Sequence, residues 1–164
     1  MNVDFQKNLQ QFTFKTYRQA QLQILNYDDL FLNKRVLVVS TTLLSMSYDQ
    51  IIRFDNAYQQ FLDLGVNDVY ILNSYDMLVA PMVDKHSKNL MGLVDSNKQF
   101  IKLLIDFYQT NKDPASAAKY WQYVLLLDNG VPRQIWQRLF KNDMPVSVVR
   151  NPTFNYYKIK AKDI

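Results

Sequence analysis

The stretch Arg35–Val79, RVLVVSTTLLSMSYDQIIRFDNAYQQFLDLGVNDVYILNSYDMLV, decides the fold of this chain. It contains a buried strand, a polar turn, an amphipathic helix and a second buried strand, which is the order of a βαβ unit. In such units the turn from strand to helix commonly carries the chemistry. Here that turn, Ser40–Ser47, contains no cysteine, histidine, acid or base. The sequence therefore indicates a fold more clearly than an activity.

The elements of this unit have distinct local signals. Val36–Val39 is a continuous β-branched and apolar run, typical of a strand covered on both faces. Apolar residues then recur every three or four positions from Ile51 to Phe61, which predicts a helix. Ser47-x-x-Gln50 has the form of a capping box at its start, and Gly65 suits the position just after its end. The second strand is expected over Val66–Leu72.

Further elements are predicted on both sides of the unit. Asn129-Gly130 between two apolar runs predicts a β-hairpin with a type I′ turn. The other expected elements are short strands around Phe12–Thr16, Leu22–Ile24 and Leu93–Val94, helices over Met77–Lys88 and Phe100–Tyr108, and a final helix from Ser147.

Length and composition limit the class of protein. The 164 residues, 48% of them hydrophobic, fit one domain over 1–164, in which the polar residues 1–11 are expected to form a loosely ordered N-terminal extension. The absence of cysteine excludes disulfides, thiolate metal sites and thiol catalysis. No signal-peptide pattern and no membrane-length apolar run are present, so a cytoplasmic location is the default expectation.

The charge pattern gives little sign of a polyanionic partner. The net charge is +4, and the lysines and arginines are scattered apart from the alternating Lys158, Lys160 and Lys162 near the end. A solvated surface explains this pattern better than a nucleic-acid footprint, so neither nucleic acid nor membrane is expected as a partner. Weak binding of RNA or a membrane surface through the basic tail stays an alternative.

Several short segments, taken in order, resemble the peroxiredoxins, most closely their type-five branch. These segments are Tyr27–Phe31 with Lys34–Leu37, Arg53-Phe54, Gly65–Val69, Asp76 with Val79, Asp95–Phe100, and Trp121 and Tyr123 before Asp128–Gly130. The resemblance covers roughly residues 12–158. It implies an α/β protein with a thioredoxin-like fold of the peroxiredoxin type, a redoxin domain whose central mixed β-sheet is flanked by helices.

The departures from the family fall on its catalytic positions. The resemblance places Met46 at the family's peroxidatic cysteine, or Ser47 if the alignment shifts by one residue. Leu43 stands at the catalytic threonine and Gln122 at the arginine. A thioether has no proton to lose, leucine donates no hydrogen bond and glutamine carries no charge. The resemblance therefore implies a pseudoenzyme with no catalytic residues.

Few other residues offer chemistry. His86 is the only histidine, and a surface role is favoured over catalysis. The carboxylates Asp28, Asp29, Asp76, Asp84 and Asp95 are better explained as turn or cap residues than as ligands of a hard cation. No metal and no cofactor are expected. An enzyme on the same fold using Asp76 or His86 in non-cysteine chemistry is the main alternative.

Self-association is the remaining expectation. Peroxiredoxins of this type often dimerise across the active-site turn, and here that turn has become more apolar than in the family. The predicted contact of a homodimer comprises Leu43, Leu44, Tyr48 and Tyr75, because large apolar and aromatic side chains favour an interface core. An unknown protein partner is also possible.

Overall fold

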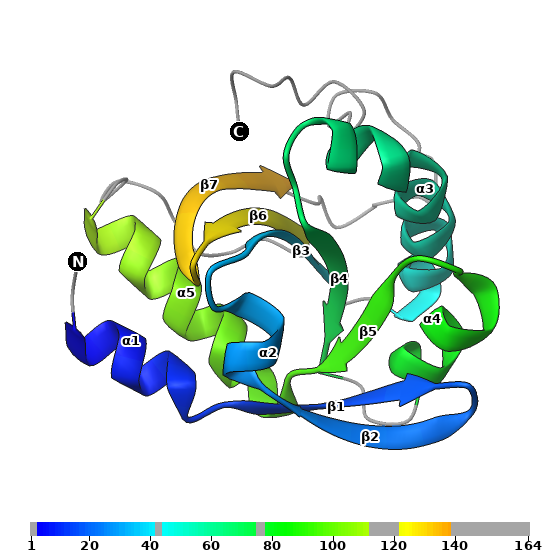
Figure 1. Cartoon of the computed structure of the whole chain (residues 1–164), viewed down its shortest axis with the longest axis horizontal. Helices are drawn as coiled ribbons and strands as arrows, with labels where there is room; N and C mark the ends of the chain where they lie inside the picture. The colour runs from blue at the N-terminus through cyan, green and yellow to red at the C-terminus, as the bar shows by residue number, and fades with distance from the viewer. Residues whose placement is uncertain (1–2, 42–43, 75–77, 112–121, 139–164) are drawn as a thin grey trace.

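The computed structural model describes residues 3–41, 44–74, 78–111 and 122–138, and shows a mixed seven-stranded sheet (Figure 1). The spatial order of the strands is β2-β1-β5-β4-β3-β6-β7. The strands are β1 (Thr13–Arg18), β2 (Gln21–Asn26), β3 (Arg35–Thr41), β4 (Asp68–Asn73), β5 (Met91–Val94), β6 (Gln122–Asp128) and β7 (Val131–Arg138). The helices are α1 (Val3–Gln10), α2 (Tyr27–Phe31), α3 (Leu44–Asp63), α4 (Val79–His86) and α5 (Gln99–Asn111), with a 3-10 turn η1 (Ser96–Lys98).

The predicted βαβ unit lies at the centre of the sheet. Strands β3 and β4 are parallel, with Val36 opposite Asp68 and Ser40 opposite Leu72, and α3 connects them. Strand β5 continues the parallel pairing on β4, whereas β1 and β6 run antiparallel to their neighbours. The α/β class with a central mixed sheet is therefore confirmed.

Helices cover both faces of the sheet, as Figure 1 shows with α1 and α5 on one side and α3 and α4 on the other. Side chains of β3 alternate between the two cores: Val36 and Val38 pack with Phe100 of α5, and Leu37 and Val39 with Phe54 of α3. Burial on both faces explains why this strand is a continuous apolar run.

Both ends of α3 can be compared with the sequence signals. The Gly65 N–H donates to the Leu62 carbonyl over 3.0 Å, and Gly65 has a φ of 91°, so the predicted helix end is confirmed. The start is different, because α3 begins at Leu44 and Ser47 lies inside its first turn. The predicted capping box is therefore wrong in position.

The hairpin prediction is confirmed. Strands β6 and β7 are joined by Asn129 and Gly130, whose φ angles of 51° and 79° are those of a type I′ turn. In α4, Pro81 falls in the first turn, where a missing N–H costs nothing. The predicted helix after Ser147 lies outside the described residues.

The N-terminal segment differs from the expectation of a loosely ordered extension. Residues 3–10 form α1, whose Phe5 and Leu9 are 4% and 0% exposed. The ring of Phe5 stacks on that of Phe107 in α5 at a centroid distance of 3.9 Å. Two apolar residues four apart are enough to dock a single short helix on a sheet face, although its composition is polar.

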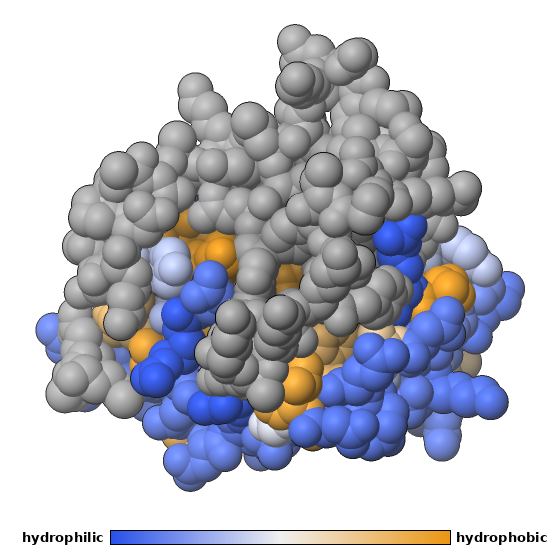
Figure 2. Space-filling view, turned by 90° about the horizontal axis from the view of Figure 1, so that it is seen from above, coloured by the Kyte–Doolittle hydropathy of each residue, from blue (hydrophilic) through white to orange (hydrophobic). Residues whose placement is uncertain are grey.

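Seen from above (Figure 2), the described side chains in view are mostly hydrophilic, with smaller apolar areas among them. Among the described helices, none is long and apolar enough to span a membrane.

Candidate functional site

The candidate site lies where β3 and β4 end and β6 begins. These two parallel strands finish at the same edge of the sheet, with Thr41 and Asn73 as their last residues. Gln122, the first residue of β6, pairs with Thr41. The fold therefore brings the backbone of Gln122 next to the strand end that leads into the turn, and Met46 and Ser47 follow in the first turn of α3.

Leu43, Tyr75 and Asp76 lie outside the described residues, as do the side chains of Leu44, Met46, Ser47 and Gln122. The assignment of Met46, or Ser47 after a one-residue shift, to the family's cysteine position stays a prediction.

Two buried polar residues, Ser40 and Asn73, lie at this edge of the sheet. Ser40 and Asn73 are 6% and 3% exposed. The Asn73 carbonyl accepts a 2.9 Å hydrogen bond from the Asp95 N–H. The sequence analysis did not single out Asn73, although a polar residue ending the apolar run Val69–Leu72 was a usable signal. Neither side chain ionises near neutral pH, so neither supplies an acid or a base. The Ser40 hydroxyl would need an adjacent general base to act as a nucleophile.

His86 is an exposed residue at the end of α4, and it contacts Tyr48 near the start of α3. The two rings meet edge to face, with centroids 5.1 Å apart and planes at 82°. Tyr48 is itself 47% exposed. The contact links the only histidine to a residue of the predicted dimer surface.

Two of the carboxylates singled out in the sequence, Asp84 and Asp95, accept hydrogen bonds from backbone N–H groups. Both oxygens of Asp84 accept hydrogen bonds from the β1–β2 turn, at 3.0 Å from the Gln19 N–H and 2.8 Å from the Ala20 N–H. Asp95 accepts from the amides of Phe100 and Ile101 at 2.8 and 2.9 Å, and its burial raises the pKa of its carboxyl group. Both residues are thus turn or cap residues, as predicted. The described residues contain no group of three or more histidine, aspartate or glutamate side chains able to hold one metal ion.

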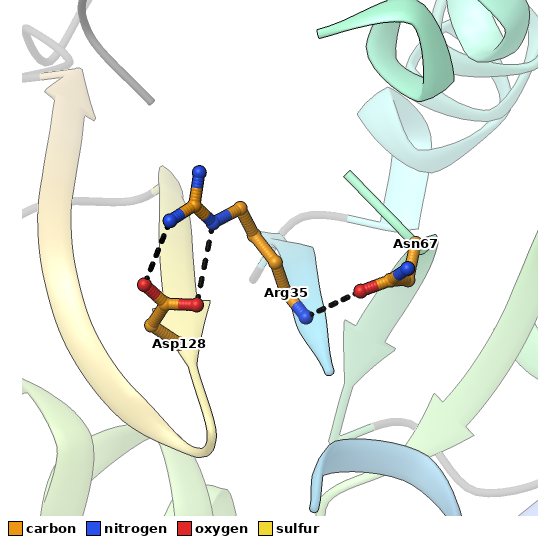
Figure 3. Close-up of polar contacts among 3 residues, drawn as sticks. All are labelled: Arg35, Asn67 and Asp128. Carbon is orange, nitrogen blue, oxygen red and sulfur yellow. Dashed lines mark hydrogen bonds and ion pairs between the residues drawn. The ribbon is translucent and has the colours of Figure 1, made fainter. Parts of the chain in front are cut away.

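Arg35 and Asp128 form a bidentate ion pair at the end of β3 opposite the candidate site (Figure 3). The Arg35 guanidinium donates to both oxygens of Asp128 at 3.3 and 2.9 Å, and the Arg35 N–H donates to Asn67 Oδ1 at 2.8 Å. The seven residues from Arg35 to Thr41 span about 20 Å of strand. Arg35 therefore links β3 to β6 and to Asn67, the residue before β4, and it is too far from Gln122 to supply the charge that Gln122 lacks.

Comparisons with known proteins agree with this architecture. No protein-family model and no curated protein matches the sequence. Three similar solved structures are peroxiredoxins. Reduced Prx3 of Vibrio vulnificus in complex with hydrogen peroxide has a TM-score of 0.60 at 16% identity, over 86% of this chain and 95% of that one.

The other two come from distant organisms. The 1-Cys peroxiredoxin of Plasmodium falciparum has a TM-score of 0.58 at 18% identity, over 79% of this chain and 78% of that one. Peroxiredoxin 5 of Alvinella pompejana has a TM-score of 0.55 at 15% identity, over 87% and 94%. The chain therefore has a thioredoxin-like fold of the peroxiredoxin type. It carries that fold without any cysteine.

Proposed function

We propose that this chain is a catalytically inactive, peroxiredoxin-like protein that acts as a homodimeric binding or structural module. One observation carries the proposal: a peroxiredoxin-type fold is built by a sequence with no cysteine. Peroxide reduction requires a thiolate that attacks one peroxide oxygen while the other leaves. A thioether at position 46 has no ionisable proton, and its sulfoxide needs a separate enzyme for its reduction.

A peroxidase assay tests the inactivity. We expect no turnover of hydrogen peroxide by the wild-type chain in the presence of a thiol reductant. Met46→Cys alone should give a slow, ordinary thiol, because the hydroxyl and the positive charge are still missing at positions 43 and 122. Ser47→Cys is the matched variant, since it tests the alternative alignment.

The triple variant Leu43→Thr/Met46→Cys/Gln122→Arg tests the assignment of all three positions. It should react with peroxide faster than Met46→Cys, because a donor and a positive charge then stabilise the thiolate and the transition state. Sustained turnover by the wild-type chain would contradict the proposal. Full peroxidase activity of Met46→Cys alone would show that Leu43 and Gln122 are wrongly assigned.

The homodimer is supported by exposed apolar groups near the candidate site. Tyr48 is 47% exposed and Leu78, which precedes α4, is 49% exposed. The segments that carry Leu43 and Leu44 on one side and Tyr75 on the other leave the sheet from neighbouring strand ends. A contiguous apolar patch formed by these residues would favour a protein–protein contact.

Sedimentation at tens of micromolar tests the dimer contact. Tyr48→Glu should lower the sedimentation coefficient of the chain, because it places a charge in this contact and removes the association that the contact provides. Gln60→Glu is the control, because it adds the same charge at an exposed position of the same helix. Equal effects of the two variants would contradict a contact at Tyr48.

A further inference from the structure

Strand β2 forms one edge of the sheet and lies along the lower rim of the molecule in Figure 1. Among the described strands it pairs only with β1, so in the described part of the chain the main-chain groups that face away from β1 have no strand partner. Natural proteins normally protect such an edge with charged residues, proline or a bulge, or by covering it. The six residues of β2, Gln-Leu-Gln-Ile-Leu-Asn, contain no charge and no proline, and their register with β1 is regular.

The hairpin geometry identifies which groups are free. Gln19 and Ala20 have φ angles of 52° and 62°, so a two-residue type I′ turn joins β1 to β2. In such a hairpin the flanking pair, Arg18 and Gln21, is a hydrogen-bonding pair, and bonding and non-bonding pairs then alternate. The main-chain N–H and C=O groups of Leu22 and Ile24 therefore point away from β1, towards the open edge.

The same two residues expose their side chains. Leu22 is 50% exposed and Ile24 is 64% exposed, on the face of the hairpin opposite the buried Phe14. An apolar side chain at every second position, beside free main-chain groups, is the pattern of a strand that has a neighbour.

We propose that the open edge of β2 pairs antiparallel with β2 of a second copy of this chain. A twofold axis through Gln23 sets Leu22 opposite Ile24 of the other copy, and Ile24 opposite its Leu22. The outward groups of Leu22 and Ile24 then bond to one another across the axis. Each exposed apolar side chain gains an apolar cross-strand neighbour, and Gln23 faces Gln23.

Electrostatics permits this pairing between identical chains. The two β2 strands bring no charge to the contact. The basic Lys15 and Arg18 lie on β1, and three strand spacings, about 14 Å, separate β1 of one copy from β1 of the other. That separation exceeds the Debye length of about 8 Å at physiological salt, so like charges on the two β1 strands are screened.

The test uses the full chain carrying Tyr48→Glu and Tyr75→Glu, which removes the dimer contact of the proposed function. This chain should still sediment as a dimer at tens of micromolar. Adding Leu22→Lys/Ile24→Lys places lysine opposite lysine twice and should weaken association about tenfold or more. Asn56→Lys/Gln60→Lys adds the same charge at exposed positions of α3 and should change nothing.

A charge swap tests the register. In the chain with Leu22→Lys/Ile24→Glu, the twofold axis sets each lysine opposite a glutamate of the other copy, so the dimer should return. Amide exchange should also be slower for Leu22 and Ile24 in concentrated than in dilute samples, while Gln21 and Gln23, which face β1, should change little.

Two results would overturn the proposal. One is a monomer when only the Tyr48→Glu and Tyr75→Glu changes are present. That result would show that the chain associates only through the contact of the proposed function. The other is failure of the charge swap to restore a dimer that the two lysines dissolve. Leu22 and Ile24 are both at least half exposed, so thermal unfolding of every variant should match its parent and exclude misfolding as the cause.

Discussion

The phenol oxygen of Tyr27 occupies the space that a Cβ atom at position 130 would need. Tyr27 is the first residue of α2 and is fully buried, and Gly130 is the second residue of the β6–β7 turn, with a φ of 79°. Asn129 connects the same turn to the segment before β3 through two hydrogen bonds. The Asn129 N–H donates to the Lys34 carbonyl at 2.9 Å, and Asn129 Oδ1 accepts from the Asn33 N–H at 2.8 Å. The hairpin is therefore docked on the segment between α2 and β3.

Gly130→Ala should lower the free energy of unfolding by about 2–5 kcal/mol. A left-handed backbone costs a non-glycine residue about 1–2 kcal/mol, and overpacking against the Tyr27 ring adds about 1–3 kcal/mol. Urea unfolding of the two chains measures the difference.

Gly65→Ala is the matched control for that measurement. Gly65 has a φ of 91°, and a Cβ atom there would meet nothing within 4 Å. Its replacement should therefore cost only the backbone component, about 1–2 kcal/mol. Equal losses of stability at positions 65 and 130 would show that the Tyr27 side chain moves away from the new Cβ atom at no cost in free energy.

Tyr27→Phe should leave stability unchanged or raise it slightly at neutral pH. The Tyr27 hydroxyl is buried and has no hydrogen-bond partner among the described residues. Removing an unsatisfied polar group removes its desolvation cost, about 1–3 kcal/mol, and leaves a small gap in its place. Urea unfolding at pH 7 checks this, and a loss above about 1 kcal/mol would indicate a partner for the hydroxyl.

Tyr27→Phe should also change how the free energy of unfolding decreases at alkaline pH. Burial, with a smaller contribution from Asp28, raises the pKa of Tyr27 from 10.0 to about 12. Between these values the unfolded chain loses the proton first, so the contribution of Tyr27 is full below pH 10 and falls as the pH rises towards 12. The loss of stability between pH 8 and pH 11 should be about 1 kcal/mol smaller in Tyr27→Phe than in the wild-type chain. An identical loss would contradict the raised pKa.

Asp95→Ala should cost about 1–3 kcal/mol, because it leaves the amides of Phe100 and Ile101 without their acceptor at the buried start of α5. Asp95→Asn keeps one of the two acceptor oxygens and should cost less. Thermal unfolding ranks the three chains. An alanine variant as stable as the asparagine variant would show that water replaces the carboxylate.

Met46→Ala should lower stability by about 2–5 kcal/mol if Leu43, Leu44 and Met46 fill the proposed site with apolar side chains. Met82→Ala is the comparison, because Met82 is a half-buried methionine packed on the core between α3, α4 and the sheet. An unchanged denaturation midpoint for Met46→Ala would mean an exposed side chain beside an open site, and would justify a search for ligands there.

The sequence by itself determined several local elements of secondary structure and excluded one class of chemistry. Period and turn chemistry predicted β3, the body of α3, the end at Gly65 and the Asn129-Gly130 hairpin, because each depends on residues close together in the chain. The lack of cysteine excluded thiol chemistry before any fold was known, since no tertiary structure can supply a missing side chain.

Only the tertiary structure decided which distant segments meet. Helix α1 looks polar in sequence, yet Phe5 and Leu9 bury it against α5 and the sheet. The strand order places β2 at an edge of the sheet. Packing between elements produces the Tyr48–His86 contact and the contact of the Tyr27 ring with Gly130. Such contacts join residues tens of positions apart, and local propensity carries no information on which of the many possible pairings the whole core will favour.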